Sequence, residues 1–300
     1  MPTLIDSQIA LRSNLMRKGI AFGLQAPRAL KRWGATEEDY RRYPPIVVDS
    51  IPKSGTHLLM QVARSLPDTH YFGSFVAWSS SLTLKKRSDQ AMLRRLSRIA
   101  PGEVVGAHLH YSPAVKEQLH RLNAVHWLII RDPVDVLLSE AHYLRSMNRF
   151  HRMAREFRSL SQQESIERAL LGSRVHHPLY PSFEDRMRPY LDWLQDEDCL
   201  IVRYEHLREA DPCEIEVRRL VRGWLHAADR DESILDQLTH SAMTALDPKK
   251  SHTFSRRLRN SEAEQREQLL RNSPIRQLRT ALGYDQDAVR DRAKKETADT

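Results

Sequence analysis

The residues best suited to chemistry in this 300-residue chain lie in the short segment 52–57, Pro-Lys-Ser-Gly-Thr-His. It follows the apolar, β-branched segment 46–51 and precedes a helix-compatible stretch that runs to Leu66. A helix N-terminus presents unpaired N–H groups and the positive end of its dipole, and a glycine there lets an anion approach the backbone. A lysine and two hydroxyl groups add further donors, so the segment predicts a phosphate or sulfate site. Its candidate ligands are Lys53, Ser54, Gly55, Thr56 and His57.

The segment departs from the Walker A pattern of nucleoside triphosphatases, G-x-x-x-x-G-K-[ST]. Lys53 precedes Gly55 instead of following it, and Ser50 stands where the first glycine would be. A nucleoside triphosphatase is therefore disfavoured. For the segment taken alone, an ordinary strand–turn–helix with a chance lysine remains the alternative.

A second candidate anion site begins at Arg131, directly after the apolar segment 124–130. Asp132 suits a helix N-cap and Pro133 a first helical position. Arg131 at a strand end can make a forked contact with a phosphate, and Ser139 follows eight residues later on the same helix. In the alternative interpretation, Arg131 caps a neighbouring helix and Ser139 faces solvent.

Short apolar segments alternate with helix-compatible ones, and this alternation predicts an α/β fold with a parallel sheet covered by helices. The expected strands are 46–51, 103–109, 124–130 and 199–204. The expected helices are 57–66, 87–99, 113–122, 133–147, 162–172, 183–195, 212–227 and 262–282. Helical insertions are expected around 68–100 and 147–195. We expect one domain over residues 45–284, an N-terminal helical extension (1–44) packed on it, and a frayed tail (285–300).

Two segments together resemble the nucleotide-binding motifs of sulfotransferases. Ile-Pro-Lys-Ser-Gly-Thr-His-Leu-Leu (51–59) resembles their 5′-phosphosulfate loop, and Ile-Arg-Asp-Pro-Val-Asp-Val-Leu-Leu-Ser (130–139) resembles their 3′-phosphate motif. The resemblance covers roughly residues 45–260. It implies a P-loop-like α/β fold, 3′-phosphoadenosine 5′-phosphosulfate (PAPS) as sulfuryl donor, 3′,5′-diphosphoadenosine (PAP) as product, and no required metal.

The resemblance also assigns roles to single residues. Lys53 would stabilise charge on the leaving phosphate, the backbone of 54–57 would hold the 5′-phosphate, and Arg131 with Ser139 would bind the 3′-phosphate. Tyr204 lies in a stretch similar to the family's Tyr-Glu-Asp-Leu segment and becomes a candidate nucleotide contact, with core packing as the alternative. A partial match to the family's Phe-x-Arg-Lys-Gly loop adds three more candidates: Phe254, Arg256 and Arg257.

The acceptor hydroxyl needs a base, and histidine is the natural one near neutral pH. The family's catalytic histidine follows a strand in a Lys-Thr-His-Leu-Pro pattern, which Gly106-Ala107-His108-Leu109-His110 resembles. His108 is therefore the expected base. His110 is its nearest rival, and His57 could also face the sulfate. The family's lysine is replaced here by a glycine, so another cation must serve or the site is weakened.

A further departure is Leu58, where many members have a tryptophan that stacks on adenine. The acceptor itself is indicated only by an apolar cluster, Tyr71, Phe72, Phe75 and Trp78, for which core packing and an acceptor pocket both remain open. A small-molecule, lipid or glycan acceptor bearing a hydroxyl fits such a cluster.

The formal net charge of +8 is spread along the chain, with no long block of one sign. Together with strand-edge phosphate motifs, this dispersal argues against nucleic-acid binding. Residues 8–33 are basic and partly apolar, so contact with a membrane surface is an alternative to packing on the domain. Two cysteines cannot form a disulfide framework, and the sequence shows no secretory or membrane-spanning pattern, so we expect a cytoplasmic protein.

The leading hypothesis is a PAPS-dependent sulfotransferase that acts on a hydroxyl group. A P-loop small-molecule kinase is the enzymatic alternative, because Asp132 follows an apolar strand much as a Walker B aspartate does. A sulfotransferase-like module that binds nucleotide without turnover is the second alternative, because of the glycine at position 106.

Overall fold

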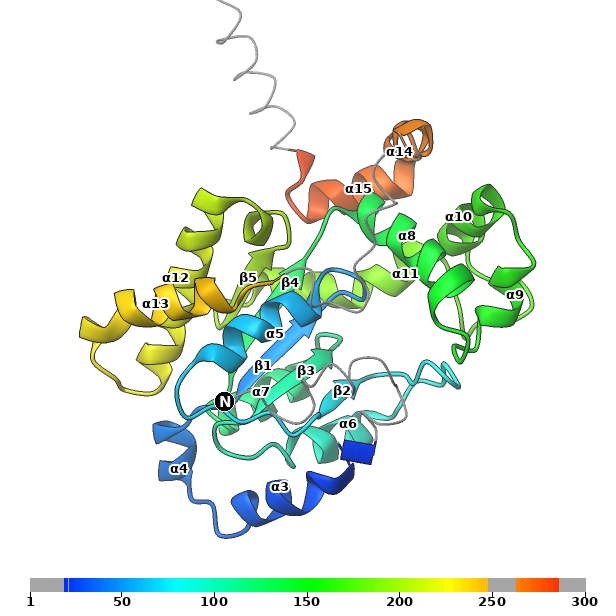
Figure 1. Ribbon diagram of the computed structural model, residues 1–300. Coiled ribbons are helices and arrows are strands. Elements are labelled where there is room, and N and C mark those ends of the chain that lie inside the picture. The colour runs from blue at the N-terminus through cyan, green and yellow to red at the C-terminus, as the bar shows by residue number, and fades with distance from the viewer. Residues whose placement is uncertain (1–18, 21, 248–262, 286–300) are drawn as a thin grey trace, which may run out of the picture.

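The computed structural model describes residues 19–20, 22–247 and 263–285. Its centre is a five-stranded, fully parallel sheet in the order β2-β3-β1-β4-β5 (Figure 1). The strands are β1 (Ile46–Ser50), β2 (Phe75–Ala77), β3 (Val104–His108), β4 (Val125–Ile130) and β5 (Cys199–Arg203). The expected parallel α/β sheet is therefore confirmed.

Helices cover both faces of the sheet, which is why its strands read as nearly continuous apolar runs. In β1, Val47 packs into the hydrophobic cluster on one face, while Ile46 and Val48 pack into the cluster on the other. The second face carries α5 (Thr56–Ser65), α12 (Ala210–Ala227) and α13 (Leu235–Ala245). The first carries α6 (Asp89–Leu96), α7 (Pro113–Arg121), α8 (Pro133–His142), α9 (Ala154–Arg158), α10 (Gln162–Leu171), α11 (Phe183–Met187), the 3₁₀-helix η3 (Arg188–Gln195) and α15 (Ser273–Ala281).

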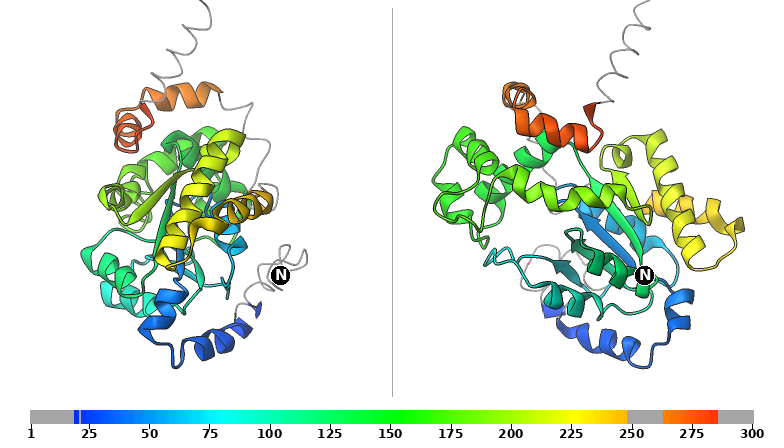
Figure 2. Two further views of the ribbon diagram at one scale, coloured as in Figure 1. Left: turned by 90° about the vertical axis from the view of Figure 1, so that its left-hand side faces the viewer. Right: turned by 180° about the vertical axis from the view of Figure 1, so that it is seen from behind.

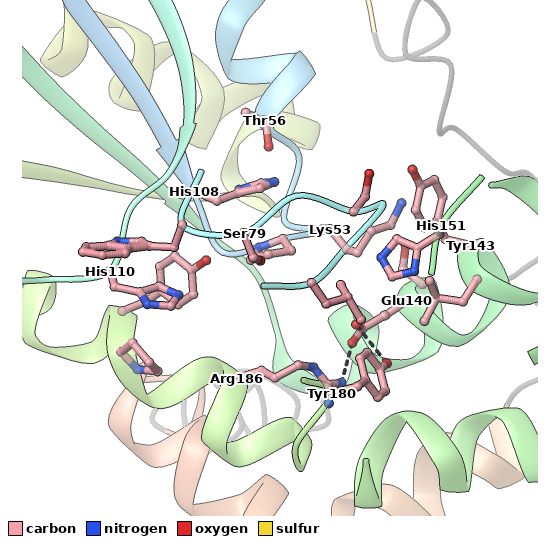
Figure 3. A pocket seen from close by; sticks show the side chains of 18 of the residues that line it. Lys53, Thr56, Ser79, His108, His110, Glu140, Tyr143, His151, Tyr180 and Arg186 are labelled. Atoms are coloured by element: carbon pink, nitrogen blue, oxygen red, sulfur yellow. Dashed lines mark hydrogen bonds and ion pairs between the residues drawn. The ribbon is translucent and has the colours of Figure 1, made fainter. Parts of the chain in front are cut away.

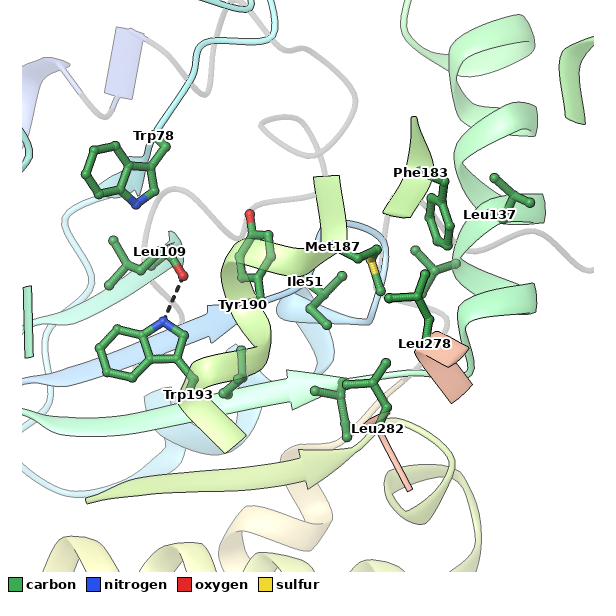
Figure 4. Close-up of a cluster of buried hydrophobic side chains, with 14 of the residues drawn as sticks. Ile51, Trp78, Leu109, Leu137, Phe183, Met187, Tyr190, Trp193, Leu278 and Leu282 are labelled. Carbon is green, nitrogen blue, oxygen red and sulfur yellow. Dashed lines mark hydrogen bonds between the residues drawn. The ribbon is translucent and has the colours of Figure 1, made fainter. Parts of the chain in front are cut away.

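Large side chains fill the cluster on the first face (Figure 4). Trp193 is fully buried there, and its indole N–H donates to the main-chain oxygen of Leu109 at 2.9 Å. Leu278 and Leu282 bring α15 and the turn after it into the same cluster, so α15 packs against α8 and α11 (Figure 2). The C-terminal helices thus support the helix that starts at Asp132. Three short segments and one helix complete the order: the π-helix η2 (Tyr143–Met147), η4 (His206–Arg208), η5 (Glu232–Ile234) and α14 (Ala263–Leu270).

The sequence missed some elements and merged others. The insertion expected around 68–100 holds the edge strand β2, whose three residues pair with β3 and show too short a pattern to be recognised. The single helix expected at 183–195 changes to a 3₁₀-helix at Arg188, because Pro189 has no N–H for an α-helical bond. The helix expected at 262–282 is two helices, since Asn272 caps a new helix with a proline in its first turn. Helix α13 was not expected at all.

The N-terminal extension contains α3 (Gln25–Arg32) and α4 (Glu37–Arg42), and no residue of either helix is buried. Polar contacts attach them: Arg28 pairs with the buried carboxylate of Glu103 at 2.8 Å, and Tyr40 donates to the main-chain oxygen of Ile99 at 2.8 Å. Within the described residues, the extension therefore contacts the domain through polar groups, and α3 buries no apolar side chain. Among the described helices, none has the length and apolar character that crossing a bilayer requires.

The strand order places the functional segments at one edge. From β1 the chain moves outward to β2 and β3 on one side, then to β4 and β5 on the other. Ligands of open α/β sheets bind beyond the carboxyl ends of the strands where the order reverses. Here that position is shared by the ends of β3, β1 and β4.

Candidate active site

The loop between β1 and α5 is held in an unusual backbone conformation. Lys53 has φ 73° and Gly55 has φ 107°, so two residues within three are left-handed. That region is costly for lysine, and such strain tends to persist at functional sites. Gly55 is required for a second reason, since a Cβ atom there would lie 2.5 Å from the ring of Tyr204. The turn directs the chain into α5, whose first helical hydrogen bond runs from the N–H of Leu58 to the main-chain oxygen of Gly55 at 2.9 Å.

Strand register brings His108 to this loop. Asp49 of β1 pairs with Ala107 of β3, so the next residues, Ser50 and His108, lie side by side. The ring nitrogen Nδ1 of His108 lies 2.9 Å from the main-chain oxygen of Ser50 and 3.0 Å from its hydroxyl. That hydroxyl is in turn 2.5 Å from the hydroxyl of Thr56 in the first turn of α5. Through Ser50, the three contacts connect the histidine to the loop 52–57.

The contacts of His108 determine where its proton lies. A carbonyl oxygen only accepts hydrogen bonds, so Nδ1 carries the proton and Nε2 keeps a free lone pair. Burial lowers the pKa of His108, although the hydrogen bond to Ser50 opposes this effect. The ring is therefore neutral near pH 7 and can accept a proton at Nε2. The edge of Phe75 packs against it, with ring centroids 4.9 Å apart.

Lys53 lies over an aromatic ring. Its Nζ is 3.8 Å from the centroid of Tyr143, the first residue of the π-helix η2. π-Helical turns are frequently found at functional sites. Burial lowers the pKa of Lys53 to about 8, while the carboxylate of Glu140 raises it and the charge of Arg131 lowers it further. At pH 7 the side chain remains a cation that can move from the ring to a bound anion.

Arg131 lies across the loop from Lys53. Its guanidinium is 4.5 Å from the ring centroid of Tyr204, and Nη1 lies 3.5 Å from the main-chain oxygen of Lys53. Its Nε is buried and has no hydrogen-bond partner among the described residues, and the same is true of the Ser54 hydroxyl. Two buried donors without partners at one loop suit a bound anion.

The neighbouring Asp132 is held from three sides. Its side chain caps α8 by accepting from the N–H of Val134 at 2.9 Å. Its Oδ2 atom lies 3.2 Å from Nε of Arg279 on α15, and its own N–H donates to Glu205 at 3.1 Å. The hydroxyl of Tyr284 donates to the other oxygen of Glu205 at 2.8 Å. These contacts fix the strand end from which Arg131 extends.

A cavity of about 700 Å³ lies beside these residues (Figure 3). The predicted site residues that line it are Lys53, Gly55, Thr56, His57, His108, Arg131, Ser139 and Tyr204. Ser54 is a buried residue of the loop and does not line the cavity. Phe254, Arg256 and Arg257 lie outside the described residues, so the structure places no 3′-phosphate contact from that loop. The last described residue before them, Asp247, is bonded to Gln61 of α5 at 2.7 Å and 3.1 Å.

The sequence did not reveal the opposite wall of the cavity. Glu140 pairs with Arg186 at 2.8 Å and accepts from the hydroxyl of Tyr180 at 3.1 Å (Figure 3). Arg186 also lies over the Tyr180 ring, 4.1 Å from its centroid. Glu140 directly follows the predicted site residue Ser139, and this position is the sequence signal by which Glu140 could have been found. Arg186 comes from a distant helix, and only the folded chain brings it to Glu140.

The structure places the apolar cluster and the two positions, 58 and 106, at which the sequence departs from the family pattern. Phe75 and Trp78 line the cavity, whereas Tyr71 and Phe72 do not. Leu58 also lines it, so the position of the family's adenine-stacking tryptophan offers an apolar contact. A Cβ atom at Gly106 would lie 2.8 Å from the ring of Phe75. The aromatic ring beside His108 therefore occupies the space that a larger residue at 106 would need.

The rival base, His110, lies farther along the cavity wall. Its ring stacks on Trp78 with centroids 5.5 Å apart and contacts the edge of Tyr190 at 5.0 Å. Burial, together with the charges of Lys86 and His108, lowers the pKa of His110 to about 4. His110 has no described bond to the anion-binding loop, whereas His108 has two contacts with Ser50. The geometry therefore favours His108 as the base.

The central strands of this parallel α/β sheet end at a loop, an arginine and a neutral histidine, a combination that suits substrates bearing phosphate or sulfate. The family model described as the sulfotransferase domain matches residues 44–286. The chain therefore belongs to the sulfotransferase family, and the function expected from its two motifs is confirmed at that level. No curated protein matches the sequence significantly.

Two solved structures are similar to this chain. Mouse sulfotransferase SULT7A1, complexed with PAP, is 19% identical with a TM-score of 0.50, and the match covers 86% of this chain and 93% of that one. A retinol dehydratase, solved with androsterone and the inactive cofactor PAP, is 13% identical with a TM-score of 0.44, and the match covers 76% and 69%. At 19% identity, the likeness to SULT7A1 supports the fold alone.

Proposed function

We propose that this sulfotransferase transfers the sulfuryl group of PAPS to a hydroxyl of a small organic acceptor. Bound PAPS supplies the sulfuryl group and leaves as PAP. The single observation that carries the proposal is the convergence of the loop 52–57, His108 and Arg131 at one end of one cavity. Catalysis of this kind needs alignment, a base and a cation for developing charge, and these residues have those properties.

The residues present fit an adenosine bisphosphate ligand. The unpartnered donor of Arg131, with the first turn of α5, suits its two anionic ends. Tyr204 stands under the Arg131 guanidinium and lines the cavity, so its ring is available to a nucleotide. Ser139 lines the same wall and supports the assignment of the 3′-phosphate to this side.

His108 acts as the general base in this proposal. The Ser50 carbonyl holds Nδ1 protonated, so Nε2 accepts the proton of the acceptor hydroxyl. Lys53 stabilises the negative charge that develops on the leaving phosphate, after moving from the Tyr143 ring. No lysine stands at position 106, so Lys53 and Arg131 provide the positive charge beside the loop.

The walls of the cavity support an acceptor with an apolar body. Aromatic and aliphatic side chains line it: Phe75, Trp78, Leu84, Leu144, Leu179 and Tyr190. A cavity of about 700 Å³ is within the size range of sites for drug-sized molecules. A small molecule or lipid-like alcohol fits these walls better than a glycan, which would need more hydrogen-bonding groups.

A calorimetric titration with PAP and with Mg²⁺-ATP tests this function. We expect PAP to bind more tightly than Mg²⁺-ATP. Arg131→Ala should weaken the affinity for PAP by roughly 10- to 100-fold, because a hydrogen bond to a charged group contributes about 1.5–3 kcal/mol. Arg158→Ala, an exposed position, is the matched control. Tighter binding of Mg²⁺-ATP would indicate a kinase instead. PAP binding without transfer from PAPS to any of a panel of alcohols would indicate a non-catalytic module.

We also propose a reducing, cytoplasmic environment and a membrane-facing surface. Cys199 and Cys213 are both unpaired and buried, as expected for reduced thiols. Phe22, Leu30 and Trp33 are 83%, 68% and 85% exposed and follow each other at helical spacing on and beside α3. The helix contains three basic and no acidic residues, so an anionic lipid surface is the partner that its charge favours.

A further inference from the structure

The cavity continues beyond His108 to an end formed by Trp78, Lys86 and His110. In Figure 3, His110 lies on the side of His108 that faces away from Lys53. The proposed nucleotide and base do not use these three residues. We call them the distal end of the cavity.

Two polar atoms at the distal end have no hydrogen-bond partner among the described residues. They are the indole Nε1 of Trp78 and the ring Nδ1 of His110. Trp78 is only 3% exposed, so bulk water does not satisfy its N–H group. A buried donor without a partner is rare in folded proteins, and beside a cavity it indicates a ligand that accepts a hydrogen bond.

The packing around the distal end holds these groups in place. The His110 ring is fixed between Trp78, on which it stacks, and the edge of Tyr190. Lys86 is tied to Trp78 by the backbone, because Ser79 and Lys86 form an antiparallel bridge and Arg87 donates to the Trp78 oxygen at 2.8 Å. As a result, Nζ of Lys86 lies 5.1 Å from the Trp78 ring centroid.

Lys86 differs from the two arginines of the cavity. Arg186 pairs with Glu140, and Arg131 lies 3.7 Å from Asp135. Lys86 has no ion pair within the part of the chain that the structure describes, and its positive charge lowers the pKa of His110, which stays neutral near pH 7. The distal end therefore presents one uncompensated positive charge and a buried N–H donor.

We propose that the distal end binds a carboxylate of the acceptor, and that the preferred acceptor is a hydroxy acid with an apolar body. Its hydroxyl reaches His108 while its carboxylate contacts Lys86 and the Trp78 N–H group. A singly charged group matches the single cation, and a carboxylate has oxygens for both donors. This inference rests on the proposed function, which identifies the cavity as the acceptor site.

The test compares three probes that differ only at the distal group: 3-(4-hydroxyphenyl)propanoate, its amide, and 4-propylphenol. Each is titrated by calorimetry into the full chain, with saturating PAP and again without nucleotide. We expect the carboxylate to bind at least 10-fold more tightly than the amide. Lys86→Met should remove that preference, and Trp78→Phe, which keeps an aromatic ring but lacks the N–H, should reduce it. Lys85→Met should retain it, because this neighbouring lysine is exposed as Lys86 is but does not line the cavity.

The outcomes separate the inference from the proposed function. Failure of PAP to bind would reject the proposed function, while the nucleotide-free titrations would still measure the carboxylate preference. Equal affinity for the three probes, or a preference that survives in Lys86→Met, would overturn the distal carboxylate site. If PAP binds but none of the probes binds at millimolar concentration, the inference is rejected as well.

Discussion

The main-chain oxygen of Ser50 accepts a hydrogen bond from Nδ1 of His108 at 2.9 Å, and this contact fixes the tautomer of the proposed base. Side-chain substitution cannot remove a carbonyl oxygen, so the orientation of the ring depends on the strand register and not on one neighbouring side chain. The Ser50 hydroxyl, 2.5 Å from that of Thr56, links the same point to the start of α5.

Replacing His108 by alanine should slow transfer without weakening nucleotide binding. General base catalysis contributes roughly 10²- to 10⁴-fold, so single-turnover transfer from PAPS should fall by that factor. The PAP affinity, measured by calorimetry, should change little. His120→Ala on the exposed face of α7 is the matched control. Near-normal transfer by His108→Ala would contradict the assignment and direct attention to His110.

The dependence of kcat/KM on pH should be bell-shaped. Burial lowers the pKa of His108, so the acid limb should lie below the ordinary histidine value of about 6.5, because the base is lost only when His108 gains a proton. The pKa of Lys53 is lowered to about 8, so activity should fall as pH rises through that value and the charge is lost. Lys53→Arg should remove the basic limb, since arginine does not titrate there. An unchanged basic limb in this variant would exclude Lys53 as its source.

Enlarging Gly106 should disturb Phe75 and, through it, His108. A Cβ atom at 106 would lie 2.8 Å from the Phe75 ring, and overpacking of this kind costs about 1–3 kcal/mol. We expect Gly106→Ala to lower the free energy of unfolding by that amount and to reduce transfer. In the Phe75→Ala background the same substitution should cost much less. Equal costs in both backgrounds, measured by urea unfolding, would show that Phe75 does not limit the position.

The contact between Arg279 and Asp132 should stabilise both the fold and the nucleotide site. Both side chains are largely buried, so Arg279→Ala should reduce the free energy of unfolding by about 1.5–3 kcal/mol. PAP affinity should also weaken, because Arg131 extends from the same strand end. Arg271→Ala, which removes an exposed pair with Glu267, should cost less than about 1 kcal/mol. A similar loss in the two variants would refute a special role for the buried pair.

The exposed apolar residues on and beside α3 should bind anionic vesicles. We expect the full chain to co-sediment with vesicles of phosphatidylserine and phosphatidylcholine, and only weakly with phosphatidylcholine alone. Combined substitution of Phe22, Leu30 and Trp33 by serine should reduce binding at least 10-fold. Ile215→Ser, at an isolated residue of α12 that is 70% exposed, is the control. Binding that is unaffected by the triple substitution, or no binding by the unmodified chain, would contradict a membrane-facing role for α3.

The sequence by itself determined the anion-binding loop, the α/β class and four of the five strands. These features depend on local patterns: β-branched apolar segments, a lysine and a glycine at a strand–helix junction, and Asp132-Pro133 at a helix start. His108 was also found locally, because it follows a strand at a position that resembles the family's base. The edge strand β2 was missed because three residues carry too short a pattern.

Only the tertiary structure decided what each of these residues contacts. Strand register, set by pairing between segments more than fifty residues apart, places Ser50 against His108 and fixes the proton on Nδ1. Chain reversal brings Arg186 to Glu140, and the loop after β2 brings Lys86 over Trp78. Local sequence determines what a residue prefers, whereas burial, pKa and unmet hydrogen bonds depend on neighbours that are distant in the chain. The distal end of the cavity is therefore formed only when the chain folds.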